Sequence, residues 1–502
     1  MIRVGLARTE PSYAGARPPW GPGKAWPELE RLLGEHAAAG PANPAYAGVR
    51  AALLALGLDA GSFGSSDWNP LGALVRRGGR VVLKPNLIRH WNPAPDGSPE
   101  SLITHGTVLR AMADYAWLAV GPEGSVIVAE APQHDCDFAR VLAISGLDEV
   151  ARFYESTLGV ELGVLDLRRE AVQYRGGVIV ERRALPGDPL GYRVVDLGSR
   201  SFFHASGLDP QRFRGADYDP APTAAHHQEG KHEYLLSETV LRSDLLVNLP
   251  KLKTHKKTGV TLALKNLVGI NGDKNWLPHH SVGSVAEGGD EYPGDALMDG
   301  ARSRAVELAR RWLARGSGKG VLRFARRAEH ALRGDRFVRA GNWYGNDTTW
   351  RMVLDLNRCL YYSDAVGLKL DSPLPVRTVL SVLDGVVAGE GEGPLAPSDR
   401  PLGTVLAATD PVALDLVALQ LMGFDPRRVA KVREALRDAG PRLSQATSGA
   451  DVQVFEASAR SFEVAPCSLD ALATGRPFTA HAGWRGHIEC QENRPLGREA
   501  NA

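Results

Sequence analysis

Three consecutive stretches decide the fold that this sequence predicts: GGRVVLKPNLI (Gly78–Ile88), THGTVLRAMADYAWLA (Thr104–Ala119) and GSVIVAEAP (Gly124–Pro132). The first and the third are short apolar runs that end in polar residues or proline, which is typical of buried strands. The second begins at Thr104, a suitable N-cap, and continues with apolar residues at helical spacing. A strand, a helix and a second strand in this order predict a parallel βαβ unit with a right-handed crossover.

The same alternation continues along the chain. Apolar runs followed by polar residues recur at SDLLVNLPKL (Ser243–Leu252) and VRTVLSVLDGVV (Val376–Val387), and a strand, a turn and a helix follow at Leu402–Gly423. This pattern predicts an α/β fold with a doubly wound, mostly parallel sheet and with helical and loop insertions. Because ligands of such folds bind beyond the carboxyl ends of the strands, we expect the functional residues there.

The predicted α/β core domain spans residues 78–425. Residues 1–77 are expected to pack on it as an N-terminal segment, and residues 426–502 to form a C-terminal extension. Two insertions are predicted, at about 170–240 and at about 300–345. Within the second, residues 302–339 are strongly basic, which indicates either a solvated helical face or a peripheral contact with a membrane.

Composition excludes several classes of protein. The 502 residues include 59 Lys and Arg against 58 Asp and Glu, so no overall charge favours nucleic acid and none is expected as a partner. The sequence shows no signal peptide or transmembrane run, and a cytoplasmic location is predicted. The four cysteines lie far apart, so we expect no iron–sulfur cluster. The oligomeric state is not indicated.

Five blocks carry a resemblance to a known family. They are VVLKPNLI, THGTVLRAM, SDLLVNLPKLKTHKKTGVTLALKNLVG, LDGVVAGEGEGP and ATDPVALDLVALQLMG, and they are distributed over most of the length of residues 78–425. The sequence resembles the domain-of-unknown-function 362 family, and the central block is the most specific match. Many members also carry a ferredoxin-like cysteine cluster, which this sequence lacks, so the electron-transfer role proposed for those members does not carry over.

The central block places lysines and a histidine behind a predicted strand. Lys253 and His255 alternate as in extended chain, so both can face the same side. Lys265 is flanked by Leu264 and Leu267, and burial of its amine would lower its pKa and favour a neutral base or nucleophile. The alternative is a structural lysine that pairs with an acid or extends to the surface.

His279 and His280 are the candidate metal ligands. Imidazole nitrogens bind nickel, zinc and iron, and a metal site needs three or four donors. Adjacent residues of a strand point to opposite faces, so one of the two is expected to face the site, and His280 is preferred. Structural, hydrogen-bonded histidines are the alternative.

The spacing of His255, Lys265 and His280 is similar to that of the nickel-pincer lactate racemase family. There a catalytic histidine, a lysine that holds the pincer cofactor covalently and a nickel-ligating histidine follow one another. The resemblance implies these roles for the three residues here, and it implies a further catalytic histidine, for which His105 in ITHGT is similar in kind. It also implies racemisation or epimerisation, in which a histidine removes a proton while the cofactor takes a hydride.

Four residues are expected to bind an anionic group of the substrate. Lys84, Asn86 and Arg89 follow a predicted strand end and offer charged and amide donors, and Lys253 adds a further ammonium group. A loop stabilised by the side chain of Asn86 is the alternative.

These residues predict an enzyme that depends on a metal or an organic cofactor and acts on a small polar substrate, anionic or polyhydroxylated. His255 and His105 are the candidate acid–base residues, and Lys265 is the candidate base or cofactor anchor. Two alternatives stay open. One is a pincer-type racemase or epimerase of a hydroxy acid or sugar, and the other is a non-catalytic protein that binds an anion or a metal.

Overall fold

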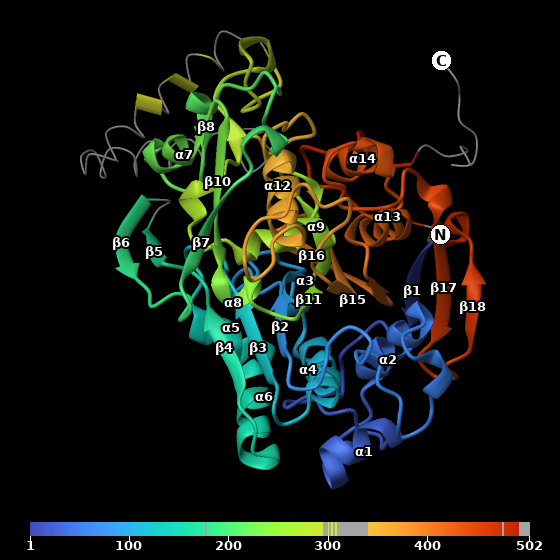
Figure 1. Ribbon diagram of the computed structural model, residues 1–502. Helices are drawn as coiled ribbons and strands as arrows, with labels where there is room; N and C mark the ends of the chain where they lie inside the picture. Colours follow the sequence, from blue (N-terminus) through green and yellow to red (C-terminus); the bar gives the residue numbers. More distant parts are fainter. Residues whose placement is uncertain are drawn as a thin grey trace.

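The computed structural model describes residues 1–175, 178–294, 340–473 and 476–490, and residues 300, 303, 304, 307 and 308. Its centre is one large sheet, in the order β18-β17-β1-β16-β15-β11-β2-β3-β4 (Figure 1). A short strand, β12, also pairs with β15, and β13 pairs with β12. The strands are β1 (Ile2–Arg8), β2 (Arg80–Pro85), β3 (Ser125–Glu130), β4 (Leu162–Asp166), β11 (Leu245–Leu249), β12 (Lys251–His255), β13 (Gly259–Val260), β15 (Val379–Glu392), β16 (Ala396–Ala408), β17 (Val452–Ser458) and β18 (Val464–Cys467).

The run β4-β3-β2-β11-β15 is parallel throughout, and β16 joins it antiparallel. Alternate residues of each strand enter two separate apolar cores, since side chains of a strand alternate between faces. Val82 of β2 lies in one core, whereas Val81 and Leu83 lie in the other. Both faces are therefore apolar, as expected for parallel strands covered by helices on both sides.

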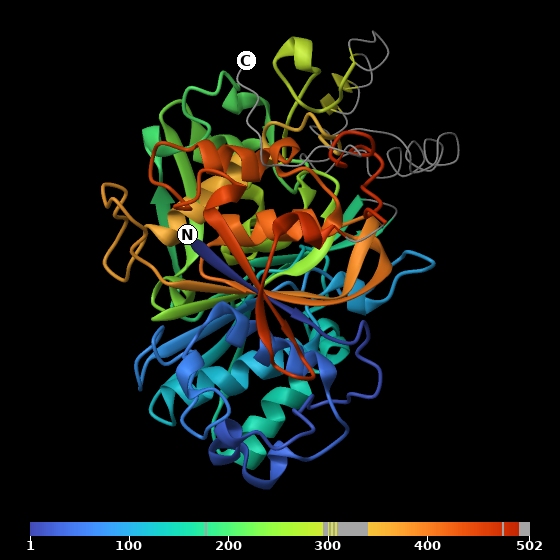
Figure 2. The ribbon, with the colours of Figure 1, turned by 90° about the vertical axis from the view of Figure 1, so that its right-hand side faces the viewer.

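Helices cover both faces, as Figure 2 shows with the sheet between two helical layers. Contacts place α2 against β1, β16 and β17 and α4 against β2 and β3, whereas α13 packs on β16. The predicted α/β fold with a mostly parallel sheet is confirmed. The described helices are α1 (Pro27–Leu33), α2 (Pro44–Leu56), α3 (Pro99–Leu102), α4 (Gly106–Val120), α5 (Phe138–Ser145), α6 (Leu147–Phe153), α7 (Ala221–His226), α8 (Glu238–Leu241), α9 (Leu262–Asn266), α12 (Thr349–Tyr361), α13 (Pro411–Met422) and α14 (Ala430–Arg437).

Both ends of the described chain add strands to the sheet. Within residues 1–77, β1 lies between β16 and β17, antiparallel to the first and parallel to the second. Residues 426–490 supply α14, β17 and β18. The sheet therefore extends beyond residues 78–425, because these segments pair with it through main-chain hydrogen bonds.

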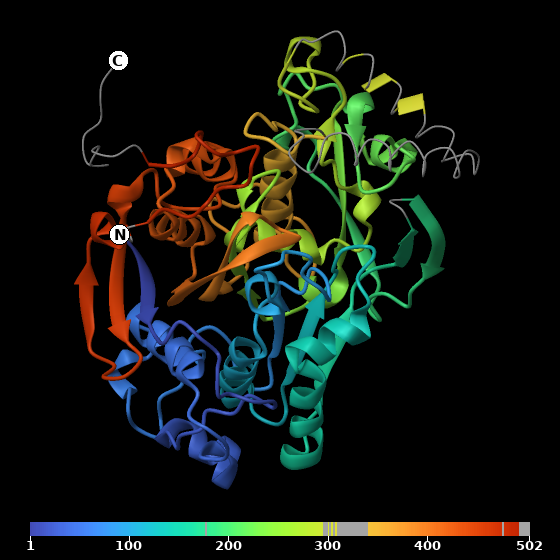
Figure 3. The same ribbon diagram turned by 180° about the vertical axis from the view of Figure 1, so that it is seen from behind.

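Residues 170–240 form small sheets beside the core. They contain the ribbon β5 (Glu170–Arg175) with β6 (Val178–Ala184), the strands β7 (Tyr192–Asp196), β9 (His227–Gln228) and β10 (Lys231–Ser237), and β8 (Phe213–Arg214), which pairs with β14 (His280–Ser281). Seen from behind, the β5–β6 ribbon and the β17–β18 pair lie on opposite sides of the molecule (Figure 3).

The basic stretch 302–339 lies almost entirely outside the described residues, so the predicted membrane contact stays a prediction. Among the helices that the structure describes, none combines the length and the apolar character needed to cross a bilayer.

Candidate functional site

A cavity of about 380 Å³ lies beyond the carboxyl ends of β2 and β3. Its walls come from the turn after β2, the end of β3, the segment from β12 to α9, and the segment before β14. The charged and imidazole side chains among the described lining residues are five lysines, four histidines and one carboxylate: Lys84, Lys256, Lys257, Lys265, Lys274, His134, His255, His279, His280 and Glu130. This cavity has the composition of an anion-binding site.

Lys265 reaches the cavity from α9, a short helix whose first turn is held by another element. Asp415, on α13, accepts hydrogen bonds from the backbone N–H of Ala263 at 2.6 Å and of Leu264 at 3.4 Å. Its carboxylate thus caps the helix from outside the segment. Leu262, at the start of α9, is buried and has a φ of 53°, a strained value for a residue with a Cβ. Such strain persists only where the surroundings impose it, and it is concentrated at functional sites.

Asp415 is itself held by a buried ion pair. The Lys431 Nζ lies 2.6 Å from the Asp415 Oδ2, and both side chains are fully buried. The same ammonium group donates to the backbone carbonyl of Thr261 at 2.8 Å. Together, Asp415 and Lys431 fix the backbone from Thr261 to Leu264, and this sets the direction from which Lys265 enters the cavity.

The amine of Lys265 forms no hydrogen bond or ion pair with another described residue. Burial lowers its pKa to about 7, and the nearby ammonium groups of Lys274, Lys431 and Lys84 add to the effect, against the opposing charge of Glu130. A substantial fraction of this amine is therefore neutral near pH 7, and a neutral amine has a lone pair available for proton transfer or nucleophilic attack.

Lys84 and Glu130 form the floor of the cavity. The Lys84 Nζ lies 2.7 Å from a Glu130 oxygen, and both side chains are buried. Parallel pairing of β2 with β3 brings these two strand ends together. Gly269 packs directly over the pair, since a Cβ there would lie 1.9 Å from the Glu130 Oε1. Across the cavity, burial lowers the pKa of Lys274 to about 7.

The backbone fixes which nitrogen of His255 carries the proton. The N–H of Lys257 donates to the His255 Nδ1 at 3.0 Å, so that nitrogen must be unprotonated. Burial and the nearby lysines, Lys265 first, hold the pKa of this imidazole well below its usual range, so the ring is neutral. The proton of His255 is therefore on Nε2, and the ring is a hydrogen-bond donor from that atom.

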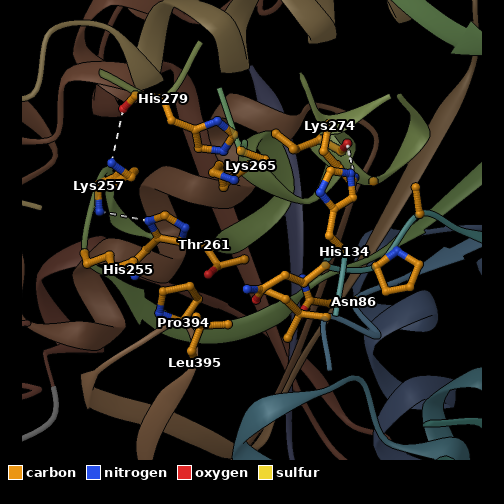
Figure 4. A pocket seen from close by; sticks show the side chains of 18 of the residues that line it. Asn86, His134, His255, Lys257, Thr261, Lys265, Lys274, His279, Pro394 and Leu395 are labelled. Carbon is orange, nitrogen blue, oxygen red and sulfur yellow. Dashed lines mark hydrogen bonds between the residues drawn. The ribbon is translucent and has the colours of Figure 1, made fainter. Parts of the chain in front are cut away.

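His279 has the opposite tautomer. Its Nδ1 lies 2.8 Å from the carbonyl oxygen of Leu277, which can only accept, so Nδ1 carries the proton. Burial lowers the pKa of His279 to about 3, which leaves the Nε2 with a lone pair. Figure 4 shows the side chains of His279, Lys265 and His255 around one space. The cavity thus places a donor and an acceptor imidazole near the same amine.

These tautomers can be observed directly. In the protein labelled with 15N-histidine, we expect couplings at about pH 7 to show Nε2–H for His255 and Nδ1–H for His279, both rings neutral. The variants His255→Gln and His279→Gln assign the two signals. A protonated ring, or the same tautomer for both residues, would contradict this arrangement.

The structure brings six of the nine predicted site residues to this cavity: Lys84, Asn86, His255, Lys265, His279 and His280. Of the two adjacent histidines, His279 is partly exposed and turns its ring toward the cavity (Figure 4), whereas both ring nitrogens of His280 are buried. This placement favours His279 over His280 as the group that meets a ligand.

Three predicted residues lie elsewhere. His105 caps α4 and stacks on Tyr13 at 3.7 Å between ring centroids, away from the cavity lining. Arg89 pairs with Asp135 at 3.3 Å. The side-chain nitrogen of Lys253 is fully buried and donates to the carbonyls of Leu102 and Pro394. These contacts support structural roles for the three side chains.

The described lining of this cavity does not favour a bare metal ion. Within the described part of the chain, no group of three or more His, Cys, Asp or Glu side chains is arranged to hold a metal. Positive charge on the lysines that line the cavity would also repel a divalent cation, although Glu130 offsets that of Lys84 and burial lowers the pKa values of Lys265 and Lys274 to about 7. A cofactor that itself carries negative charge would be compatible with the same lysines. The predicted metal or pincer cofactor stays untested.

The fold and the cavity define a class: an α/β protein with a lysine-rich ligand cavity beyond the carboxyl ends of its parallel strands. Residues 194–420 match the sequence model of the domain of unknown function DUF362, which confirms the family resemblance over that region. The central block with Lys253, His255 and Lys265 lies inside the matched region. The similarity in spacing to the lactate racemase family stays a prediction.

One curated relative matches part of the chain. A thylakoid-associated protein of Synechocystis sp. is 23% identical over 217 residues, which is 43% of this chain and 42% of that protein. The match therefore spans less than half of the relative's own length. For this chain, a cytoplasmic location stays a prediction. No solved structure matches the chain.

Proposed function

We propose that this protein is an enzyme that acts on a small anionic substrate with a carbonyl group, and that Lys265 is its nucleophile. One observation carries the proposal: an amine with no partner among the described residues lies in a cavity with four other lysines and a single carboxylate. A lysine that is desolvated and surrounded by cations is a recognised form of activated amine, and it reacts with carbonyl groups.

The other lysines bind the anion. Lys256, Lys257 and Lys274 line the cavity beside Lys265, whereas Lys84 is already neutralised by Glu130. Charge-assisted hydrogen bonds from these ammonium groups to a carboxylate or phosphate hold the substrate. The negative charge of the bound substrate also offsets the mutual repulsion of the lysines.

The imidazoles support addition of the amine to the carbonyl. The nitrogen of Lys265 forms a bond to the carbonyl carbon, and the π electron pair moves to oxygen, which the Nε2–H of His255 stabilises by a hydrogen bond. The Nε2 of His279 receives the proton that the nitrogen loses, and the negative substrate raises the proton affinity of that ring. The nitrogen loses its second proton in the same way, both protons pass to the oxygen, the C–O bond breaks as water leaves, and the nitrogen lone pair forms the C=N bond of an imine.

Chemical trapping tests this function. The protein is incubated with glyoxylate, a small anionic aldehyde, and then reduced with borohydride, which converts an imine into a stable secondary amine. We expect labelling at Lys265, found by peptide mass mapping, to exceed labelling of the exposed Lys24 by a factor of about 10² or more, in line with the usual gain from a positioned reactive group.

The matched control is Lys265→Arg, which keeps a cation but removes the nucleophile, because arginine stays protonated. It should lose the trapped product while still binding malonate in calorimetry. Equal labelling of Lys265 and Lys24, or labelling at other cavity lysines in both proteins, would contradict the proposed nucleophile.

The same lysines also favour a second candidate, a non-catalytic protein that binds an anion. That function predicts malonate binding with no trapped imine in the wild-type protein.

Metal dependence, including a pincer-type cofactor on Lys265, is tested by a separate experiment. Elemental analysis and intact mass of the protein, expressed with ample metal in a host that makes the pincer, would then show a metal and added mass at Lys265.

A further inference from the structure

Three asparagine side chains form a chain of hydrogen bonds beneath the cavity. The Nδ2 of Asn248, on β11, donates to the carbonyl of Ala263 at 3.1 Å. The Nδ2 of Asn266, on α9, donates to the Asn248 Oδ1 at 2.8 Å. The Nδ2 of Asn86, just after β2, donates to the Asn266 Oδ1 at 2.8 Å. All three asparagines are buried.

The contact with Ala263 fixes the orientation of each side-chain amide in this series of hydrogen bonds. A backbone carbonyl can only accept, so the amide that meets Ala263 must be the NH₂ group of Asn248. The Asn266 Nδ2 also donates to the carbonyl of Lys84 at 3.2 Å, which fixes the second amide in the same way. The Asn266 Oδ1 can therefore only accept, so the NH₂ group of Asn86 must be the group that meets it. The Asn86 Oδ1 takes no part in this series of hydrogen bonds.

The Asn86 Oδ1 has no hydrogen-bond partner among the described residues. Asn86 is 8% exposed, and it lines the cavity. Its backbone is held in place, since its N–H donates to the Thr104 Oγ1 at 2.9 Å and its carbonyl accepts from the Thr104 N–H at 3.0 Å. A rigid, buried acceptor without a donor is unfavourable, unless a ligand or water donates to it.

Thr261 offers a second unmatched group on the cavity wall. Its Oγ1 is buried and has no hydrogen-bond partner among the described residues, whereas its backbone is fixed by Lys253 and Lys431. Thr261 lines the cavity together with Asn86 (Figure 4). The lysines of the cavity recognise negative charge, whereas the Asn86 Oδ1 can only accept a hydrogen bond and the Thr261 hydroxyl can donate or accept one.

We infer that the natural ligand carries a hydroxyl group, which donates its hydrogen to the Asn86 Oδ1, in addition to the anionic group that the lysines bind. The hydroxyl oxygen can in turn accept from Thr261. This inference deepens the proposed function and rests on it: the substrate class becomes a small hydroxylated carbonyl anion. Asn86 and Thr261 are then specificity residues, which select the hydroxylated compound over its deoxy analogue.

Two probes that differ by one hydroxyl group test this inference. Tartronate is malonate with a hydroxyl group on its central carbon, and both are small dianions without a carbonyl that would react with Lys265. By calorimetry, we expect wild-type protein to bind tartronate about 10-fold more tightly than malonate, the value of one well-made hydrogen bond to a buried acceptor.

Asn86→Ala should abolish this preference and leave the malonate affinity within about 3-fold, since the lysines stay in place. Thr261→Val, which is nearly isosteric, should reduce the preference without changing the fold, so the test does not depend on one variant. Equal affinities in the wild-type protein, or an unchanged preference in Asn86→Ala, would overturn the inference and leave the proposed function intact. If neither dianion binds and glyoxylate is not trapped, the proposed function itself fails.

Discussion

Replacing Asp415 with alanine is expected to lower the free energy of unfolding by about 3–5 kcal/mol, the range found when one partner of a buried ion pair is removed. The Lys431 ammonium would be left buried without its carboxylate, although it keeps its contact with the Thr261 carbonyl. The backbone N–H groups of Ala263 and Leu264 would also lose their acceptor. Because these contacts hold α9, Lys265 should also lose its position.

Urea unfolding of Asp415→Ala and of the wild-type protein measures this difference in the free energy of unfolding. Asp371→Ala is the control, since Asp371 pairs with Arg200 but is 97% exposed, and its loss should change the stability by less than about 0.5 kcal/mol. The double variant Asp415→Ala/Lys431→Met should recover part of the loss, because no unpaired charge remains buried. A loss below about 1 kcal/mol for Asp415→Ala would show that the pair does not hold α9.

Replacing Lys265 with methionine is expected to stabilise the protein below about pH 7, by roughly 2–5 kcal/mol. The pKa of Lys265 is lowered to about 7 in the folded protein, whereas an unfolded lysine titrates at its ordinary value. Below both values the folded state must protonate a buried amine, which costs about 1.4 kcal/mol for each unit of the difference. Methionine removes this penalty.

The sign of the pH dependence follows from proton binding. From about pH 7 to about pH 10, the unfolded state holds a proton on Lys265 that the folded state has released, so wild-type stability rises with pH in this range. The advantage of Lys265→Met should therefore shrink across it. Urea unfolding at several pH values measures the difference, with the exposed Lys24→Met as control. A difference that does not vary with pH would indicate an ordinary pKa for Lys265.

Much of the fold could be predicted from the sequence, because apolar runs and helical spacing are local signals. The β2–α4–β3 unit appears where the three quoted stretches place it. Main-chain pairing of the two ends of the described chain could not be predicted in this way. β1 and β17 are far apart in sequence, and only the folded sheet shows that they are neighbours.

The predicted site residues that lie together in the structure are mostly those that are also close in sequence. His255 and Lys265 lie in one block, and the leucines beside Lys265 indicate the burial that lowers its pKa. Glu130 and Lys274 were missed. The pairing of β2 with β3 brings Glu130 to Lys84, and no spacing pattern marks it. The only local signal was that Glu130 ends a predicted strand.

His105 lies away from the cavity lining for a similar reason. Its position after a strand and before a helix is typical of site residues, but its ring packs on Tyr13, a contact between distant segments. The tautomers of His255 and His279 depend on individual hydrogen bonds with backbone groups, and so does the direction of the asparagine chain. Such details are set by angles and distances that a sequence does not contain.

The proposed function requires that Lys265 has a neutral, accessible amine near neutral pH. Competitive labelling with trace acetic anhydride over a range of pH, followed by peptide mass spectrometry, measures the titration of each lysine separately. The structure predicts a midpoint of about 7 for Lys265, well below the ordinary lysine value of about 10.4. A midpoint for Lys265 close to the ordinary lysine value, or no labelling of Lys265 at any pH, would contradict a neutral, accessible amine.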